Sequence, residues 1–585
     1  MPENIHPMLD SFAVASNDET EAFALRAAPL SRGTRRTVIE TRRARVAIQC
    51  ANAAAIERQV RAVGGETELV TPKDGGSADI VLAEVPLDGI GQLANSDAVY
   101  LVTPAVEARP NMDAARPAVW SSGSVDIPST AGRGAGVVVG VVDTGIDWRH
   151  PDFRHADGTT RIHRLLVQDR SSQQEFTSAQ INAALAGGAL IPGDDDPDGH
   201  GHGTHVTSTA AGNGAASQGR LRGIAPEASI IAVRTDFNTN NVRRAVSYVF
   251  QQAGTNPAVV NLSLGSHFGP HDGTSDFDQV IERLVGPGRI VVASAGNESG
   301  DGIHAGARLP GNSRFVADIL LNPGNGGSPA SAMIDIWIPA GDQMDLVLRT
   351  PDGDLIQTGS AMSNTRWRAR VAPVAAMNGD TNVFVTITVM ELSSATLHGW
   401  SLIFSSRQVT DGRVHAWILN SDMARFTTGA SNSHLVGEPA TSRGAIAVAA
   451  WASKRQWDSQ AGQIIKPAIQ LGGIAHFSSP GPSRDERNKP EIAAPGQWIS
   501  AALSSQIQAD PTLVDPSGQY RMMQGTSMAA PVVTGAVALL LEKFGPLTPQ
   551  QVLARLVAGC VSDVHTGVTW NARWGFGKLQ LDRIL

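Results

Sequence analysis

The feature that most constrains this chain is a run near its C-terminus that is apolar on every side of a helix. Gly525, Thr526 and Ser527 are followed by Met, Ala, Pro and a nearly unbroken series of Val, Ala and Leu up to residue 541. A helix that is apolar all round lies inside a large core, and its first residues then face the outside of that core. The pattern therefore predicts a buried helix whose N-terminus presents Ser527.

Two interpretations of Ser527 compete. A Ser or Thr ahead of an apolar helix is what N-capping calls for, because the side-chain oxygen accepts a hydrogen bond from a backbone N–H of the first turn. A serine in this place can also be a nucleophile, provided that a base lies beside its hydroxyl and that donors stabilise an oxyanion. Whether the rest of the chain supplies a base and donors decides between them.

Length, charge and cysteine content limit the class of protein. The 585 residues are enough for several domains and at least one large core. The net charge of -8 over this length predicts neither nucleic acid nor a membrane surface as a partner. Cys50 and Cys560 lie far apart in the sequence and are expected to be free thiols.

The N-terminal region shows no basic start followed by an unbroken apolar stretch, so no secretory signal is predicted. No stretch of the sequence is expected to be long, apolar and uncharged enough to span a membrane. We therefore expect a cytoplasmic protein, and export by an unrecognised signal stays open.

The first hundred residues are expected to form a small domain behind a leader. Residues 1–43 are interpreted as a flexible leader, and residues 106–125, which contain Pro110 and Pro117, as a linker. Between them, residues 44–105 show the order strand, helix, strand, strand, helix, strand, which predicts two helices on one antiparallel sheet. The expected elements are 44–50, 54–63, 66–71, 79–85, 87–94 and 98–103.

The next region has the pattern of a parallel sheet. The apolar run 137–142 is bounded by glycines and is typical of a buried parallel strand. Further strand-like runs at 259–264 and 290–293 alternate with helical patterns at 242–253 and 277–284. This alternation predicts a doubly wound α/β domain.

The pattern changes after about residue 307. Short alternating runs separated by Gly, Pro, Asn and Asp predict an all-β sandwich or jelly roll over residues 308–422. Apolar strands rich in Ala return at 445–451. The β module is therefore predicted to be an insertion that divides the α/β domain into residues 126–307 and 423–585.

Asp143 directly follows the first buried strand and is succeeded by Thr144 and Gly145. A carboxylate at the carboxyl end of a central strand lies where open α/β sheets place their sites. A plain strand-end turn is one alternative. An aspartic protease is another, but it needs a second Asp-Thr-Gly loop to share a proton, and the sequence contains no second copy.

Three histidines and an acidic run follow. His200, His202 and His205 have the spacing of metal ligands and resemble the cluster of metallo-β-lactamase-type hydrolases, although Thr204 stands where that motif has Asp. The acidic residues 194–198 are interpreted as a solvated loop, since a full set of calcium ligands is not recognised.

Four separated segments resemble those of the subtilisin-like serine proteases. They are residues 142–147 with 150–153, residues 201–206, residues 293–297 and residues 525–531. Together, in the order Asp, His, Asn, Ser, they are highly specific. The resemblance covers roughly residues 111–305 and 430–585, and it implies the doubly wound parallel sheet of that family.

The resemblance assigns roles residue by residue. It implies that His202 takes the proton of Ser527 and returns it to the leaving amine, and that Asp143 orients the imidazole. Asn297 and the backbone N–H of Ser527 would bind the oxyanion. The walls of the primary specificity pocket, on which extended substrate would add as a strand, would be Ser263, Leu264 and Gly265 on one side and Ser294, Ala295 and Gly296 on the other.

The N-terminal domain is similar to the ferredoxin-like propeptides of the same family. It would act as an intramolecular chaperone and inhibitor, with a tail near residues 102–113 in the substrate groove until it is cut. The insertion and the extra residues ahead of His202 resemble the bacterial subgroup related to clostridial germination proteases. The resemblance implies no cofactor for the chemistry. It allows a structural calcium ion, for which Asp152 matches one ligand position and the other metal ligands are unknown.

The leading hypothesis is a serine endopeptidase that works through an acyl-enzyme on Ser527 and is made as an autoprocessed zymogen. Its partners would be protein or peptide substrates and its own propeptide. The alternative is a catalytically silent scaffold of the same fold that presents the β insertion to a partner. A metallohydrolase is the third reading.

Overall fold

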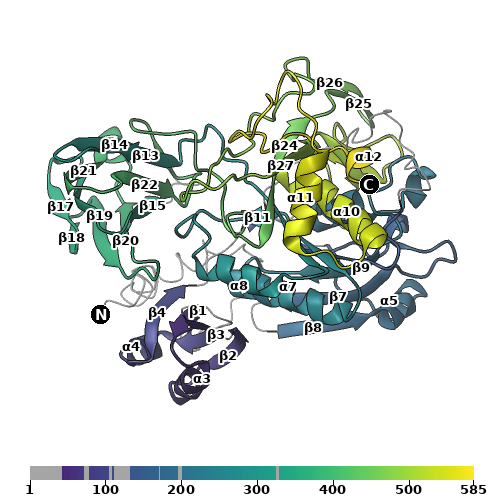
Figure 1. The fold of residues 1–585 in the computed structure, drawn as a ribbon, viewed down its shortest axis with the longest axis horizontal. Helices are drawn as coiled ribbons and strands as arrows, with labels where there is room; N and C mark the ends of the chain where they lie inside the picture. The colour runs from purple at the N-terminus through teal and green to yellow at the C-terminus, as the bar shows by residue number, and fades with distance from the viewer. Residues whose placement is uncertain are drawn as a thin grey trace.

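The computed structural model describes residues 43–71, 78–104, 109–110, 132–169, 172–194, 200–323 and 329–585. They form three parts (Figure 1): an N-terminal domain, drawn in purple, an α/β domain, and a β domain beside it. Residues 1–42 of the expected leader, and all of the expected linker except Arg109 and Pro110, lie outside the described residues.

The α/β domain is built on a sheet of eight described strands in the order β27-β24-β12-β10-β6-β9-β7-β8. The pairs are parallel except β7 with β8. The strands are β6 Val138–Asp143, β7 Ile162–Asp169, β8 Ser172–Thr177, β9 Ser229–Arg234, β10 Ala258–Leu262, β12 Arg289–Ser294, β24 Ala445–Ala452 and β27 Ile492–Gln497. The predicted fold class is confirmed.

Helices cover both faces of this sheet, which explains why its strands are continuously apolar. Val139 and Val141 of β6 face the core that α6 and α10 share, whereas Val138 and Val142 face the core beneath α7 and α8. The helices are α5 Ser178–Leu185, α6 His202–Ala211, α7 Thr239–Ala253, α8 Asp276–Leu284, α10 Thr526–Phe544, α11 Pro549–Gly559 and α12 Leu581–Ile584.

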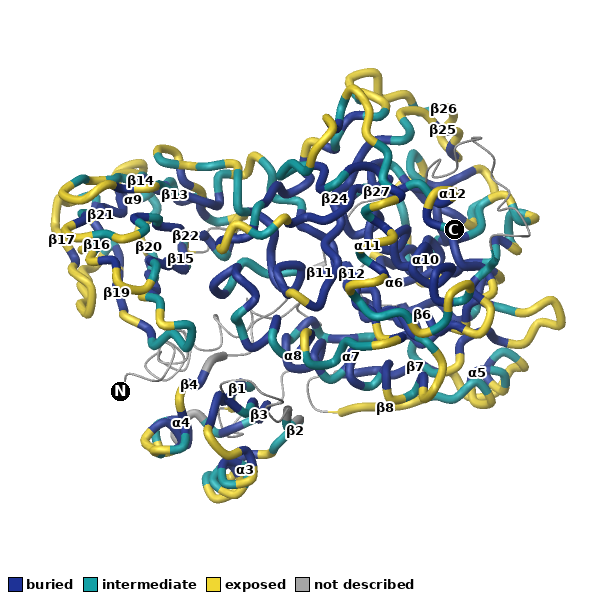
Figure 2. Tube along the Cα trace, viewed as in Figure 1, coloured by how far each residue is buried: buried dark blue, intermediate teal, exposed yellow. Residues whose placement is uncertain are grey.

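Helix α10 is the apolar helix that the sequence predicted. By length and composition it is long and apolar enough to cross a membrane, so the expectation that no window reaches that length is wrong for this segment. In the fold, 83% of its most apolar stretch is buried, and the helix forms the centre of the largest core. Figure 2 draws this helix mainly in the colour of buried residues. Its apolar surface is thus accounted for by packing.

The N-terminal domain contains the predicted strands and helices. They are β1 Arg43–Cys50, α3 Ala53–Ala62, β2 Glu66–Thr71, β3 Asp79–Pro86, α4 Leu87–Ala94 and β4 Val99–Pro104, and the antiparallel strand order is β2-β3-β1-β4. One face of the sheet packs on its own helices. On the other face, Ala47, Ile80 and Leu82 contact Val280 of α8, with Leu284 beside them. The domain is therefore docked on the α/β domain through its open sheet face.

The β domain is a sandwich of two antiparallel sheets around one apolar core. The described strands have the orders β13-β22-β15-β20-β19-β18 and β17-β16-β21-β14-β23. They are β13 His304–Arg308, β14 Arg314–Leu321, β15 Ala330–Ile338, β16 Gln343–Arg349, β17 Leu355–Gln357, β18 Ser360–Ser363, β19 Trp367–Val374, β20 Thr381–Val389, β21 Trp400–Gln408, β22 Arg413–Ile418 and β23 Ala424–Phe426. The sandwich extends a few residues beyond the expected 308–422 at both ends, because β13 and β23 pair with its sheets.

One short pairing joins the N-terminal region to the α/β domain. Strand β5, Arg109–Pro110, lies antiparallel to β11, Leu264–Gly265. The remaining short elements are two hairpins and three single turns: β25 Gln456–Ser459 with β26 Gly462–Ile465, β28 Ile499–Ala502 with β29 Tyr520–Met523, and the turns η2 Pro151–Phe153, η3 Ala215–Ser217 and α9 Ser394–Leu397. Cys50 and Cys560 are free thiols, as predicted.

Candidate active site

Asp143 and His202 form a buried pair at the carboxyl end of β6. Asp143 Oδ1 lies 2.6 Å from His202 Nδ1 and accepts a hydrogen bond from the Thr144 N–H at 2.8 Å. Both side chains are fully buried. A carboxylate against Nδ1 keeps the proton on that nitrogen and leaves Nε2 as the basic one. The pair therefore has the arrangement of an oriented general base.

Two glycines bring His202 to this position. Helix α6 begins at His202, and the N–H of Gly203 donates to Thr144 Oγ1 at 2.8 Å. A side chain at Gly203 would collide with the Gly145 carbonyl oxygen, and Gly145 has a φ of +123°, which favours glycine. The start of α6 can thus lie against the loop that follows β6 because Gly203 lacks a Cβ, while Gly145 allows the backbone conformation of that loop.

Ser527 is the second residue of α10, not its cap. Gly525 occupies the N-cap position and makes no side-chain cap hydrogen bond. The Ser527 side chain is buried, and its Oγ lies 3.4 Å from the Ser263 carbonyl oxygen. The capping interpretation of Ser527 is therefore wrong.

A polar network fixes the backbone of Ser527. Pro531, four residues later, has no N–H, so the Ser527 carbonyl lacks its normal helical donor. Ser263 Oγ supplies a replacement and donates to that carbonyl at 2.5 Å. Asn261 Nδ2 donates to Ser263 Oγ at 2.9 Å, and the Asn261 Oδ1 accepts from the Thr534 hydroxyl at 2.9 Å. The start of α10 is thus tied to the end of β10.

This network places Ser527 at the same sheet edge as the Asp143 pair. Strands β10 and β6 are adjacent and parallel, with Leu262 opposite Val142, so Ser263 and Asp143 follow at neighbouring strand ends. Helices α6 and α10 also pack closely at Gly535, where a Cβ would lie 3.0 Å from the Ala210 carbonyl oxygen. The three predicted catalytic residues therefore come together at one edge.

Asn297 lies at the end of the neighbouring strand β12. Its Oδ1 accepts from the Thr526 N–H at 2.9 Å and lies 3.1 Å from the Thr526 hydroxyl. Its own backbone N–H donates to Glu298 Oε2 at 2.7 Å. Because the amide oxygen is held by Thr526, the Nδ2 group remains as a donor for a ligand.

Comparison with known families decides the classification. The model described as "Subtilase family" matches residues 134–577, which is most of the chain. The chain belongs to the subtilase family. The Asp, His, Asn and Ser residues that the sequence singled out all lie within the matched region.

Individual subtilases are distant from this one. The Minor extracellular protease Vpr of Bacillus subtilis is 24% identical over 483 residues, which cover 77% of this chain and 51% of Vpr. The C5a peptidase of Streptococcus pyogenes serotype M1 is 24% identical over 451 residues, which cover 71% of this chain and 35% of that protein. The chain thus spans about half or less of the length of these relatives.

A solved subtilase structure shares the fold. The CspB protease of Clostridium perfringens superposes with a TM-score of 0.65 at 24% identity, over 78% of this chain and 95% of that chain. The similarity to the clostridial subgroup that the sequence predicted is thus found in the structure as well.

The two segments expected to form the walls of the substrate pocket differ in whether their backbone groups can pair with an added strand. Leu264 and Gly265 pair with Pro110 and Arg109 as an added strand. By contrast, the Ala295 N–H donates to the Val448 carbonyl at 3.1 Å, and the Ala295 carbonyl accepts from the Gly437 N–H at 3.3 Å. The expectation that both segments pair with substrate as strands is therefore wrong at Ala295.

The three-histidine metal cluster is not assembled. His200 is exposed, whereas His205 is buried with Nε2 at 3.2 Å from the Ile499 carbonyl and 3.3 Å from the Arg521 carbonyl. Burial lowers the pKa of His205 to about 3, so it is a neutral core residue. Since His202 is held by Asp143, these histidines do not converge on one ion.

Asp194 corrects the interpretation of the acidic run as a solvated loop. It is buried and accepts from the Thr144 hydroxyl at 2.7 Å and from the Thr204 N–H at 2.8 Å. Burial raises its pKa to about 6. Asp194 thus braces the loop that holds Asp143, while residues 195–199 lie outside the described residues.

The surroundings of Asp152 do not fit a calcium ion. Its Oδ1 accepts from the Tyr520 hydroxyl at 2.8 Å and from the Ala216 N–H at 3.2 Å, and its Oδ2 faces the Ser208 hydroxyl at 3.4 Å. A calcium ligand needs its oxygens directed at the ion, whereas these are directed at protein donors. Asp152 therefore contributes to packing through Tyr520.

Proposed function

We propose that this subtilase is a serine endopeptidase that hydrolyses peptide bonds through an acyl-enzyme on Ser527. The observation that supports it best is the buried 2.6 Å pair of Asp143 and His202 at the sheet edge that also holds Ser527. In the reaction, Ser527 Oγ attacks the scissile carbonyl carbon and passes its proton to His202 Nε2, and Asp143 stabilises the imidazolium.

The developing negative charge is stabilised by two donors. The oxygen of the tetrahedral intermediate would accept from Asn297 Nδ2 and from the Ser527 N–H. His202 then gives its proton to the leaving amine, and the C–N bond breaks. Water, activated by the same imidazole, attacks the acyl-enzyme and releases the second product.

The proposal includes synthesis as a zymogen. The N-terminal domain covers α8, and its continuation at Arg109 and Pro110 pairs with β11 as an extended substrate would. Residues 105–108 and 111–113 of the expected inhibitory tail lie outside the described residues. We expect the substrates to be extended protein or peptide chains that replace this segment after processing.

Active-site labelling tests the catalytic part. A fluorophosphonate probe should label the processed protein and should fail to label Ser527→Ala and His202→Ala. The matched control is Ser360→Ala, which removes an exposed serine hydroxyl of the β domain and should label like the parent. Absence of labelling in processed parent protein would favour the silent scaffold.

Intact mass tests the zymogen. The parent should lose its first hundred or so residues, while Ser527→Ala stays at full length. Identical masses for the two proteins would contradict autoprocessing without bearing on labelling. Peptide-library mapping of cleavage sites, with Ser527→Ala as control, would then define the residue preference.

A further inference from the structure

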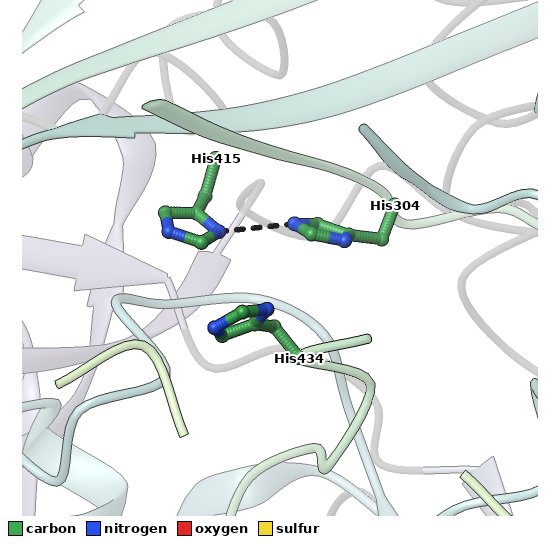
Figure 3. A group of neighbouring side chains, drawn as sticks. All are labelled: His304, His415 and His434. Carbon is green, nitrogen blue, oxygen red and sulfur yellow. Dashed lines mark hydrogen bonds between the residues drawn. The ribbon is translucent and has the colours of Figure 1, made fainter. Parts of the chain in front are cut away.

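Three histidines far apart in the sequence meet where the β domain joins the α/β domain (Figure 3). His304 lies on β13 and His415 on β22, and because His304 stands opposite Trp417 in that antiparallel pair, the two histidines share one face as diagonal neighbours. His434 comes from the segment that returns to the α/β domain, and its carbonyl accepts from Trp417 Nε1 at 2.9 Å. The cluster therefore joins both ends of the insertion.

The spacing of the ring nitrogens is that of ligands on one ion. His304 Nε2 lies 3.1 Å from His415 Nδ1, and one ring nitrogen of each of the three histidines lies within 4.8 Å of the others. Two nitrogens that bind one tetrahedral Zn²⁺ at about 2.0–2.1 Å lie roughly 3.3 Å apart. His304 and His415 already have this separation, and His434 completes a triangle.

Each of the two innermost rings has one nitrogen that faces the other ring and one that lacks a partner in the part of the chain that the structure describes. His304 and His415 are only 1% and 4% exposed. His304 Nδ1 and His415 Nε2 have no hydrogen-bond partner among the described residues. Because both rings are buried, the neutral imidazole is favoured over the charged one, and each neutral ring keeps a lone pair for a metal.

Packing alone does not explain this composition. Trp417 stacks against His304, His415 and, on the α/β domain, His271. Apolar rings would stack equally well. They would also avoid a buried nitrogen without a hydrogen bond, which costs free energy. A bound ion would use the lone pairs of the facing nitrogens, His304 Nε2 and His415 Nδ1, and would leave the proton of each ring on the nitrogen that has no partner among the described residues.

The positive charges near the cluster are paired with carboxylates and therefore do not exclude a cation. Arg413 and Arg484 are two positive groups close to His415. Arg413 is paired with Asp411 at 2.6 Å and with Glu486 at 2.8 Å, and Arg484 is paired with Asp272 and Asp380 at 2.5 Å each. Neither guanidinium is left uncompensated, so each repels a second cation only weakly.

An access route and an outer carboxylate are present. His415 lines a cavity of about 310 Å³ together with Asp272, Asp380, Arg413 and Arg484. Glu486 Oε1 lies 3.5 Å from His434 Nε2. Carboxylates in this position commonly orient a metal-binding imidazole.

We propose that His304, His415 and His434 bind one divalent transition-metal ion such as Zn²⁺, with Glu486 orienting His434, and that this ion fastens the β domain to the α/β domain. The ion is structural and takes no part in peptide hydrolysis. The donor set is all imidazole, which suits Zn²⁺ over Ca²⁺ or Mg²⁺.

Metal binding is measured on the full chain carrying Ser527→Ala, which prevents self-cleavage and makes the result independent of the proposed protease activity. After treatment with a chelator, Zn²⁺ is titrated against a competing chromophoric chelator, and Co²⁺ is added separately to read its visible absorption. We expect one tightly bound equivalent, a Co²⁺ spectrum of low coordination number, and a higher thermal midpoint with Zn²⁺.

Variants assign the site. His304→Ala and His434→Ala should lose this binding, and Glu486→Gln should weaken it by roughly 10–100-fold, the usual cost of an outer partner. His398→Ala removes an exposed β-domain histidine outside the cluster and should bind like the parent. Because a buried-histidine variant can fail to fold, Glu486→Gln and the half-buried His434→Ala carry the test. Parent protein without a bound equivalent, or equal affinity in His434→Ala, would overturn the proposal.

Discussion

Asn297 takes its orientation from Thr526, whose N–H donates to the Asn297 Oδ1 at 2.9 Å and whose hydroxyl lies 3.1 Å from the same oxygen. Thr526 directly precedes Ser527, so the same residue helps to position both the proposed nucleophile and the proposed oxyanion donor. The Thr526 hydroxyl also lies 3.1 Å from both the N–H and the carbonyl of Gly296. The start of α10 and the end of β12 are thereby held as one unit.

Replacing Asn297 should therefore act on the chemical step. Asn297→Leu removes Nδ2, and we expect kcat to fall by about 10²–10³, the loss measured for this donor in subtilisin, a member of the same family. Thr526→Val removes only the hydroxyl and keeps the N–H, so a smaller fall is expected. Steady-state kinetics on a peptide substrate would show it. A large rise in KM with unchanged kcat would contradict a transition-state role.

Ser263 replaces the backbone donor that Pro531 lacks, and this predicts that a second substitution can restore the stability lost on removing the Ser263 hydroxyl. Ser263→Ala leaves the buried Ser527 carbonyl without a donor and should cost about 1–3 kcal/mol of unfolding free energy, with reduced kcat. Adding Pro531→Ala supplies a backbone N–H that can donate to the same carbonyl. Chemical denaturation in the Ser527→Ala background should show the double variant to be more stable than Ser263→Ala. An additive double loss would contradict this network.

Sequence periodicity was sufficient for the parts of the fold where local pattern and burial agree. The apolar run of β6 and the all-round apolar helix α10 admit few alternatives, and the N-terminal domain alternates clearly. Strand β8, Ser172–Thr177, was missed because it is a polar edge strand whose first four residues are exposed. No periodicity distinguishes such a segment from a loop.

The sequence singled out the residues of the proposed site but not the contacts that support them. A proline four residues after Ser527 shows from sequence that the Ser527 carbonyl needs another donor, but only the register of β10 beside β6 identifies that donor as Ser263. His304 and His415 are 111 residues apart and follow no ligand spacing. Their meeting depends on the pairing of β13 with β22, which no local pattern encodes.

Docking of the N-terminal domain should depend on the apolar contact of Leu82 with α8. Leu82→Asp places a charge in that interface and should undock the domain while leaving its own helix-covered core intact. In the Ser527→Ala background, amide hydrogen exchange of Asp276–Leu284 should become faster. Arg58→Asp, on the exposed side of α3, serves as control and should leave exchange unchanged. Equal protection in Leu82→Asp would show that α8 is not the docking surface.

Beneath this interface, Asp278 of α8 predicts how stability depends on pH. Its Oδ2 accepts from the Thr441 hydroxyl at 2.8 Å, its Oδ1 has no partner among the described residues, and burial raises its pKa from 3.8 to about 7. Thr441, Arg487 and Lys489 oppose that rise, while burial and the neighbouring Asp278 charge also raise the pKa of Glu438.

Between pH 4 and 7 the folded protein therefore keeps a proton on Asp278 that the unfolded chain has released. The free energy of unfolding consequently falls as pH rises through this window, and above pH 7 the loss is complete. Asp278→Asn has no ionisable group at this position and should not show this loss of stability. From pH 4 to pH 8, its stability relative to the parent should rise by on the order of 4 kcal/mol.

Urea denaturation at several pH values in the Ser527→Ala background measures this difference. Asp354→Asn, which changes an exposed carboxylate of the β domain, should follow the parent at every pH. A constant difference between Asp278→Asn and the parent would mean that Asp278 is ionised in the folded protein throughout. The charge would then have to be compensated by Arg487 and Lys489, and the α8 interface would tolerate it without protonation.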